Sequence, residues 1–247
     1  MFWAQMVDGA KPGSGLTRRD FMGAAAVVGM ASVTGSGWPL AAAKDKTMDV
    51  KLVAVPESLP EKVFTTERVG ISRKTHEEHL KLWQGYARKT NEIRQKLAAL
   101  DTDPAKANQI YSDIRALKAD YSFAYEGLIN HNVYFDTIGG AGGPATGRIA
   151  TLIEQAYGSF EAWVQDLKAT GMGARGWVFT AYDHEEKRIF NYLGDAQNTF
   201  PIWNHTLVLA LDVYEHAYYL DFATARAKYL DAYVQVIDWN AVNARLG

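Results

Sequence analysis

Apolar residues recur at helical spacing over two long stretches after residue 70. The first predicted helix begins after Ser72, which is placed as an N-cap, and runs to about Leu100. A second helix is predicted from Pro104 to about Phe135, because proline is accepted in a first helical turn. Two long helices joined by a short turn form an antiparallel helical hairpin.

The pattern changes after the glycine-rich segment 139–144, the strongest break in the chain. Shorter helical periods follow it, and then runs rich in β-branched and aromatic residues. The elements predicted there are helices near 146–157 and 159–170, strands over 176–182, 188–193 and 207–211, and helix again over 213–246. The sequence therefore predicts an α+β fold, in which an N-terminal antiparallel helical hairpin precedes a C-terminal α/β half with a three-stranded antiparallel sheet.

The N-terminal segment has three parts of an export signal in the expected order. The motif TRRDFM at 17–22 resembles the twin-arginine signal of bacteria, a weakly apolar run follows, and Ala41-Ala42-Ala43 offers a small-residue cleavage site. The apolar run is too short to span a membrane, so we expect export to the periplasm and no membrane association after cleavage. The predicted division is a signal peptide over 1–43, an N-terminal arm and helical hairpin over 44–138, and a C-terminal α+β domain over 139–247.

The composition of the chain limits the metal ligands and the partners that it can have. The chain has 247 residues, a formal charge of −2 and no cysteine. Without cysteine, disulfides, zinc–thiolate sites and iron–sulfur clusters are excluded, so histidine and carboxylate side chains must hold any metal. Lysine and arginine form no long basic block, and no nucleic-acid partner is therefore expected.

Candidate metal ligands occur in the segment Asp212 to Phe222, DVYEHAYYLDF. Asp212 and His216 are four residues apart and would project to the same side if the chain were helical there. A carboxylate oxygen beside an imidazole nitrogen suits iron, manganese or zinc. An isolated D-x-x-x-H is more often an ordinary helix with a surface acid and a half-buried histidine.

The flanking residues favour the metal site, because this segment resembles the D-x-W-E-H-A-Y-Y signature of the iron/manganese superoxide dismutases. The resemblance extends from about Ile71 to the end of the chain through several motifs in the same order. Those motifs are Ser72-Arg73-Lys74-Thr75 followed by His79, Gln84-Gly85-Tyr86, Asn130-His131 with Tyr134 and Phe135, and Gly176-Trp177.

The resemblance implies a mononuclear iron or manganese centre that converts superoxide to oxygen and hydrogen peroxide. It implies Tyr86 as the active-site tyrosine and Trp177 as a wall of the site. It also implies a homodimer, in which Glu215 and Tyr219 would reach the partner subunit. The implied metal ligands are His79, His131, Asp212 and His216.

The sequence departs from the family pattern near the implied centre. The family places a glutamine beside the metal-bound solvent, from one of two positions, and those positions are Gly127 and Gly173 here. Another group would have to do that work, and Asp212 is expected to substitute in part. The segment between His79 and Tyr86 is one residue short and lacks a second histidine that links the tyrosine to the partner subunit. Tyr214 stands where the family usually has tryptophan.

Two alternatives to an active dismutase remain open at this point. One is a relative of weak or no activity that keeps its metal, which the missing glutamine favours. The other is a metal-free interaction module on the same fold. Of the remaining histidines, His76 is expected to face away from the centre, and His184 and His205 are expected at the surface.

Overall fold

The structure is a computed structural model, and it describes residues 50–247. The predicted signal peptide over 1–43 and the start of the predicted arm lie outside the described residues. Within the described part, no helix combines the length and the apolar character that crossing a membrane requires.

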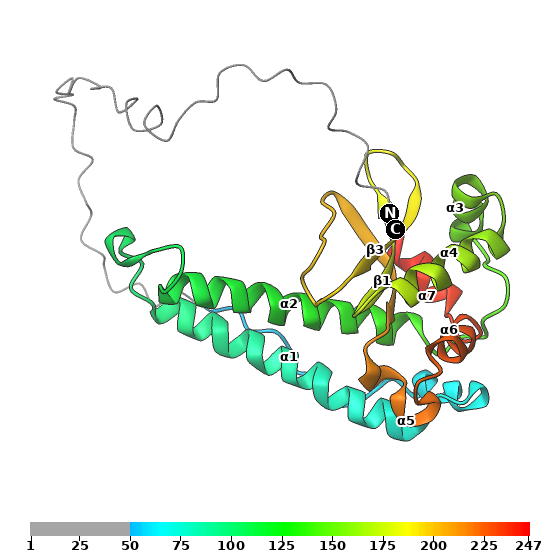
Figure 1. Cartoon of the computed structure of the whole chain (residues 1–247), viewed down its shortest axis with the longest axis horizontal. Coiled ribbons are helices and arrows are strands. Elements are labelled where there is room, and N and C mark those ends of the chain that lie inside the picture. The colour runs from blue at the N-terminus through cyan, green and yellow to red at the C-terminus, as the bar shows by residue number, and fades with distance from the viewer. Residues whose placement is uncertain (1–49) are drawn as a thin grey trace, which may run out of the picture. The chain divides into compact units, whose positions relative to one another are not determined.

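The predicted helical hairpin is present and consists of α1 (Arg73–Ala99) and α2 (Asp113–Thr137) (Figure 1). Ser72 caps α1 as expected, with its hydroxyl accepting a hydrogen bond from the backbone N–H of Thr75. The two helices contact each other along much of their length. Each can therefore present side chains to the space between the hairpin and the rest of the chain.

The prediction that the second helix begins at Pro104 was wrong. Only a 3-10 turn, η2 (Pro104–Lys106), forms there, and α2 begins nine residues later at Asp113. The side chain of Asn108 accepts hydrogen bonds from the backbone N–H groups of Ile110 and Tyr111. This local turn satisfies the backbone without a helix, so the loop at the tip of the hairpin is longer than expected.

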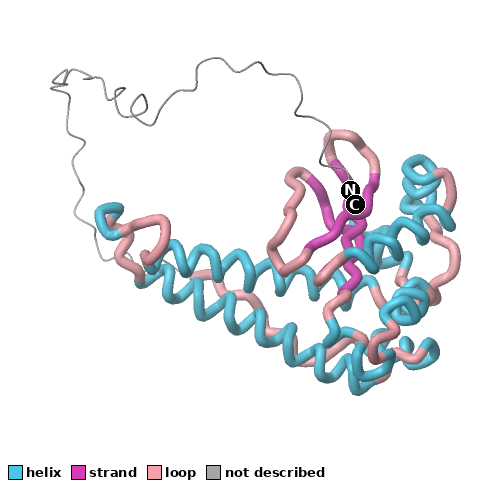
Figure 2. The backbone as a smooth tube through the Cα atoms, viewed as in Figure 1, coloured by secondary structure: helices cyan, strands magenta, loops and turns pink. Residues whose placement is uncertain are grey.

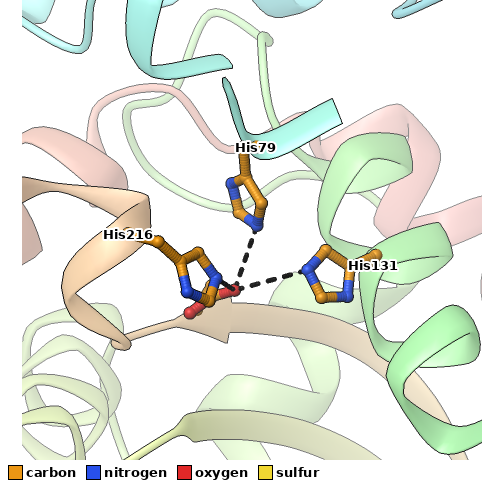
Figure 3. A group of neighbouring side chains, drawn as sticks. His79, His131 and His216 are labelled. Carbon is orange, nitrogen blue, oxygen red and sulfur yellow. Dashed lines mark hydrogen bonds and ion pairs between the residues drawn. The ribbon is translucent and has the colours of Figure 1, made fainter. Parts of the chain in front are cut away.

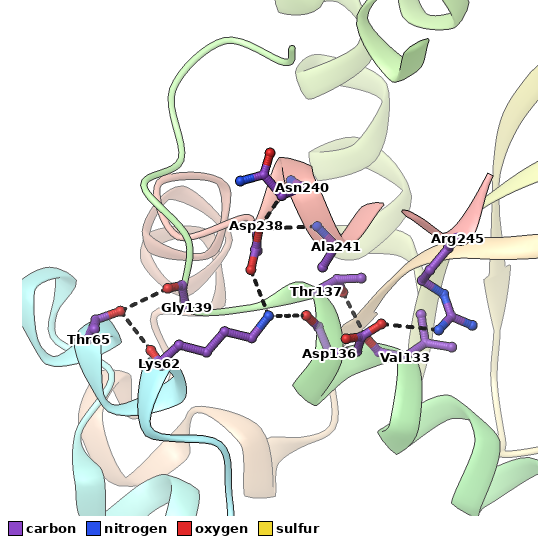
Figure 4. A network of polar contacts seen from close by, with 10 residues as sticks. All are labelled: Lys62, Thr65, Val133, Asp136, Thr137, Gly139, Asp238, Asn240, Ala241 and Arg245. Carbon is purple, nitrogen blue, oxygen red and sulfur yellow. Dashed lines mark hydrogen bonds and ion pairs between the residues drawn. The ribbon is translucent and has the colours of Figure 1, made fainter. Parts of the chain in front are cut away.

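The predicted extended arm is also partly wrong, because residues Glu61–Val69 form a 3-10 helix, η1. Lys62 of η1 ties the arm to two distant segments (Figure 4). Its ammonium donates to the carboxylate of Asp238 and to the backbone oxygen of Asp136, both over 2.6 Å. Arg245 reaches Asp136 from the C-terminal end of the chain. These contacts hold the end of α2 in place.

The predicted three-stranded antiparallel sheet is confirmed. Its strands are β1 (Trp177–Asp183), β2 (Ile189–Gly194) and β3 (His205–Asp212), in the order β2-β1-β3. In this register Trp177 lies opposite Gly194 on one side and Asp212 on the other. The last residue of β3 therefore lies next to the first residue of β1, at one end of the paired strands.

Helices pack around the sheet, as the tube in Figure 2 shows. The two helices predicted after the glycine-rich segment are present as α3 (Arg148–Tyr157) and α4 (Phe160–Gly173). The tail is broken into shorter pieces than the sequence predicted. They are η3 (Glu215–Ala217), α5 (Tyr219–Phe222), α6 (Arg226–Val234) and α7 (Trp239–Arg245). One buried apolar cluster joins α2, the sheet and these helices.

The glycine-rich segment runs against residues 235–237. The backbone N–H groups of Gly139 and Gly140 both donate to the carbonyl of Val236. Gly142 has φ of +66°, and a Cβ atom there would collide with the backbone of Gln235. The backbones of the two segments approach so closely that only small residues fit in the glycine-rich segment.

Candidate metal centre

Four side chains from four different elements meet at the junction of the hairpin and the sheet (Figure 3). They are His79 of α1, His131 of α2, Asp212 at the end of β3 and His216 of η3, and their ligand atoms all lie within 4.8 Å of one another. The Oδ2 atom of Asp212 is 3.2, 3.8 and 3.1 Å from the Nε2 atoms of the three histidines, in chain order. The first three residues are buried, and the ring of His216 is partly exposed.

Asp212 and His216 converge for a different reason from the one expected. The chain does not continue as a helix through this segment, because Asp212 ends β3 and His216 lies in the 3-10 turn that follows. The backbone N–H of Tyr214 donates to Oδ1 of Asp212 over 2.9 Å. This turn brings His216 back to Asp212 and leaves Oδ2 facing the imidazoles.

The orientation of His131 is set by a backbone contact. Its Nδ1 atom lies 2.6 Å from the carbonyl oxygen of Gly127, one turn earlier on α2. A carbonyl only accepts, so Nδ1 carries the proton and Nε2 presents a lone pair to the cluster. Histidines that bind metals are commonly oriented in this way.

Burial keeps two of the imidazoles neutral. It lowers the pKa of His79 to about 4, against the opposing influence of Asp212. It lowers the pKa of His131 to about 3, and the neighbouring His79 acts in the same direction. Both rings therefore offer neutral nitrogen donors at physiological pH.

The carboxylate is ionised despite its burial. Burial alone would raise the pKa of Asp212, but His216 and His79 together hold that pKa below its usual value. The pKa of His216 is raised, because Asp212 outweighs the lowering effect of burial. The cluster thus combines three imidazoles with one carboxylate whose charge is matched only by these rings.

This donor set fits a transition-metal cation. The Nε2 atoms of His79 and His131 are buried, and neither makes a well-aligned hydrogen bond within residues 50–247, although Oδ2 of Asp212 lies 3.2 Å from the first. A buried polar atom without a partner costs free energy, and a bound cation would remove that cost. Imidazole nitrogens with one carboxylate suit iron, manganese or zinc.

The rings of Tyr86 and Trp177, which the resemblance implied for this site, both lie close to His131. The ring centroids of Tyr86 and His131 are 5.2 Å apart, and those of Trp177 and His131 are 5.1 Å apart. Trp177 is fully buried, whereas Tyr86 is half-buried. Burial and, secondly, Asp212 raise the pKa of Tyr86, so the phenol keeps its proton.

The sequence left open which group would take the place of the missing glutamine, and in the structure the side chain of Gln197 lies beside Trp177. Its side chain is buried, and its Oε1 atom accepts a hydrogen bond from the indole N–H of Trp177 over 3.0 Å. The side chain of Gln197 also acts on Tyr86, where it partly offsets the rise in the pKa of the phenol. The amide therefore links the two aromatic walls of the site.

Sequence reasoning missed Gln197 because the residue lies in the loop between β2 and β3, twenty positions after Trp177. The side-chain N–H of Asn130 donates to the backbone oxygen of Gln197 over 3.0 Å and holds this loop against α2. Asn130 is adjacent to His131, so the same turn of α2 positions a metal-ligand candidate and the glutamine.

Of the two positions considered for the glutamine, Gly127 has no room for a side chain and Gly173 faces open space. At Gly127 a Cβ atom would lie 2.6 Å from the ring of Tyr86, so the aromatic ring occupies the space that a side chain would need. Gly173 is the last residue of α4, and a Cβ atom there would meet nothing within 4 Å. Gly127 is therefore required for the placement of Tyr86 in the site.

The other histidines lie outside the cluster. His76 is buried and its Nε2 atom is 2.7 Å from the hydroxyl of Thr66, away from the centre as expected. His184 is exposed, as predicted. The expectation of a surface position was wrong for His205, which is half-buried with Nε2 3.0 Å from the hydroxyl of Tyr192.

Comparisons with known proteins agree with this geometry. Residues 145–245 match the family model described as iron/manganese superoxide dismutases, C-terminal domain. A protein named superoxide dismutase [Fe] from Aquifex pyrophilus is 38% identical over 180 residues, covering 71% of this chain and 84% of its own length. Superoxide dismutase [Fe] of Pyrobaculum aerophilum is 32% identical, covering 68% and 80%. Superoxide dismutase [Mn] 2 of Haloferax volcanii is 31% identical, covering 66% and 79%.

The contact between Gly127 and Tyr86 predicts that alanine substitutions at Gly127 and at Gly85 have opposite effects on stability. Gly127→Ala should destabilise the protein by about 1–3 kcal/mol, because the ring of Tyr86 has to move. Gly85→Ala is the matched control, since that glycine lies in α1 beside Tyr86 with open space around its Cβ position. It should stabilise the protein by about 0.5–1 kcal/mol. Urea unfolding of both variants measures the difference, and equal effects would contradict the assigned role of Gly127.

Proposed function

The chain belongs to the iron/manganese superoxide dismutase family, and from that premise we propose that His79, His131, Asp212 and His216 hold one iron or manganese ion. The reaction is the conversion of superoxide to oxygen and hydrogen peroxide. The observation that carries the proposal is the convergence of four donors, two of them buried imidazole nitrogens without another partner in the described chain. Such an arrangement is costly without a cation and favourable with one.

A bound iron or manganese ion would supply the one-electron exchange that dismutation needs, which redox-inert zinc cannot provide. The chain's own donors set the charge of the site. Asp212 contributes one negative charge and the imidazoles of His79 and His131 are neutral, so a divalent cation is only partly compensated. The remaining positive charge attracts an anionic substrate such as superoxide.

Tyr86 and Gln197 organise the protons next to this centre. The indole N–H of Trp177 can only donate, so its contact fixes Oε1 of Gln197 as the acceptor and leaves the amide N–H group to donate. We assign the phenol oxygen of Tyr86 as the acceptor of that amide N–H, in agreement with the lowering effect of Gln197 on the pKa of Tyr86. The phenol O–H is then free to donate toward substrate or solvent. Trp177, fully buried, excludes water from that side.

Both alternatives considered from the sequence lose their support. The case for a weakly active relative rested on an absent glutamine, and Gln197 supplies that amide from another segment. A metal-free interaction module would have to bury His79, His131 and Asp212 together with unpartnered nitrogens and no compensation. A metal-free module also leaves the orientation of all four donors toward one point unexplained.

The metal-ligand proposal predicts about one iron or manganese ion per chain in the purified protein. Asp212→Ala and His131→Ala should each abolish metal retention and superoxide consumption, because each removes one of four donors. His184→Ala is the control, since that exposed histidine lies outside the cluster. Elemental analysis and a superoxide-consumption assay measure both properties. Zinc alone, or full metal content in either ligand variant, would refute the assignment.

We further propose that the chain forms a homodimer through the surface that carries Glu215 and Tyr219. Both residues are exposed, and the carboxylate of Glu215 has no ion pair within residues 50–247. Glu215 lines an open cavity of about 610 Å³ together with Arg175, Arg226 and His216, whose ring is partly exposed. A metal-binding histidine usually donates its second N–H to a carboxylate, and Glu215 of a second copy would supply one.

The dimer proposal predicts the mass of two chains in sedimentation at micromolar concentration. Glu215→Ala should weaken association by at least about tenfold, as expected for the loss of a charge-assisted hydrogen bond at an interface. Glu154→Ala, on the exposed face of α3, removes the same charge elsewhere and should leave the dimer intact. A monomeric wild-type protein would contradict the proposal.

We also propose export to the periplasm through the twin-arginine pathway, based on the motif around Arg18 and Arg19. This pathway transports folded proteins, which suits a protein that is loaded with its metal before export. Replacing both arginines with lysine should retain the full-length chain in the cytoplasm of a bacterial host, without changing its metal content. Cell fractionation measures this, and equal export of the wild-type and Lys-Lys proteins would contradict it.

A further inference from the structure

A second cavity, separate from the candidate metal centre, lies between the outer face of α2 and the loop that joins β2 to β3. Its volume is about 650 Å³, within the range typical of small-molecule sites. Ser122, Glu126 and Ile129 form one wall, since they share one face of α2. The loop residues Ile202 and Trp203 form the opposite wall.

Hydrogen bonds hold the inner end of the loop against α2. The cavity is therefore formed by the protein alone. The side-chain N–H of Asn198 donates to the hydroxyl of Ser122 over 2.7 Å. Asn130 holds the backbone of Gln197 in the same way. At the outer end, Trp203 is 83% exposed, which leaves a large flat apolar surface at the rim.

Glu126 is the one group in this cavity whose charge has no counterpart. It is half-buried, and no hydrogen bond or ion pair engages its carboxylate anywhere within residues 50–247. Burial raises its pKa, which reflects the cost of holding the charge there. A carboxylate in such a position is stabilised by any cation that reaches it.

The other ionisable groups of the cavity do not balance Glu126. Arg245 is already engaged, by the carboxylate of Asp136 at 3.3 Å and by the backbone oxygen of Leu207 at 2.9 Å. Burial lowers the pKa of His205, which keeps that imidazole neutral beside Tyr192. The cavity therefore combines apolar and aromatic walls with one uncompensated negative charge.

We propose that this cavity binds a small organic cation, namely a protonated amine carried on a flat apolar body. The ammonium group pairs with Glu126, and the hydroxyl of Tyr192 lies within the same cavity as a further acceptor. The flat body packs between Ile202 and the indole of Trp203, where stacking and cation–π attraction add to the charge pairing. An anion of the same shape is excluded by Glu126.

The site is independent of the proposed dismutase reaction, because none of the four metal-ligand candidates lines it. Its inner wall nevertheless contains Asn130 and Gln197, which also belong to the surroundings of the metal centre. The probe should therefore be tested on the metal-loaded, full-length protein. Binding itself, rather than superoxide turnover, is the property to measure.

Titration calorimetry with tryptammonium, the protonated form of tryptamine, tests the proposal. A ligand of this size in a half-open site should bind with a dissociation constant on the order of 10⁻⁴ to 10⁻³ M. Indole-3-propionate has the same ring and the opposite charge, and it should not bind measurably. Equal binding of the two ligands would overturn the proposal, as would the absence of tryptammonium binding.

Glu126→Gln removes the charge while keeping the shape of the side chain, and it should weaken tryptammonium binding by at least about tenfold. Glu154→Gln makes the same change of net charge on α3, away from the cavity, and should bind as the wild type does. Trp203→Ala should weaken binding through the loss of the apolar rim. Unchanged affinity in Glu126→Gln, with an unfolding midpoint equal to that of the wild type, would refute the assigned role of Glu126.

Discussion

The buried carboxylate of Asp212 is the constraint on which the rest of the site depends. An ionised side chain with no solvent exposure requires partners, and three imidazoles from three other elements surround its Oδ2 atom. The backbone N–H of Tyr214 engages Oδ1, and the hydroxyl of Tyr229 donates to the backbone oxygen of Asp212. The end of β3 is thereby held in one position, toward which the hairpin histidines are directed.

Close packing against the backbone of α2 positions the residues around this centre. Gly127 leaves room for the ring of Tyr86, and its carbonyl oxygen accepts a hydrogen bond from Nδ1–H of His131, so one residue of α2 positions two members of the site. Gln197 then joins Tyr86 to Trp177 across the sheet. A change at Gly127 therefore alters the placement of both Tyr86 and His131.

Helix α2 serves two different environments. Its inner face carries His131 and is buried against the sheet, whereas its outer face carries Glu126 beside the cavity under the β2–β3 loop. Asn130 lies between the two and holds the loop by its backbone. The same loop thus delivers an amide to the metal centre on one side and an indole to the cavity on the other. The metal centre and the cavity are therefore connected by tertiary contacts and not by neighbouring positions in the sequence.

The sequence by itself determined the helical hairpin, the three strands and the four donor residues, because periodicity and motif order are local properties of the chain. It did not determine the late start of α2, where the side chain of Asn108 forms a turn, or the 3-10 turn that brings His216 back to Asp212. Nor did it reveal Gln197 beside Trp177. Some of those features depend on contacts between residues far apart in the chain. The others depend on which of several local hydrogen bonds forms, and the folded structure decides this.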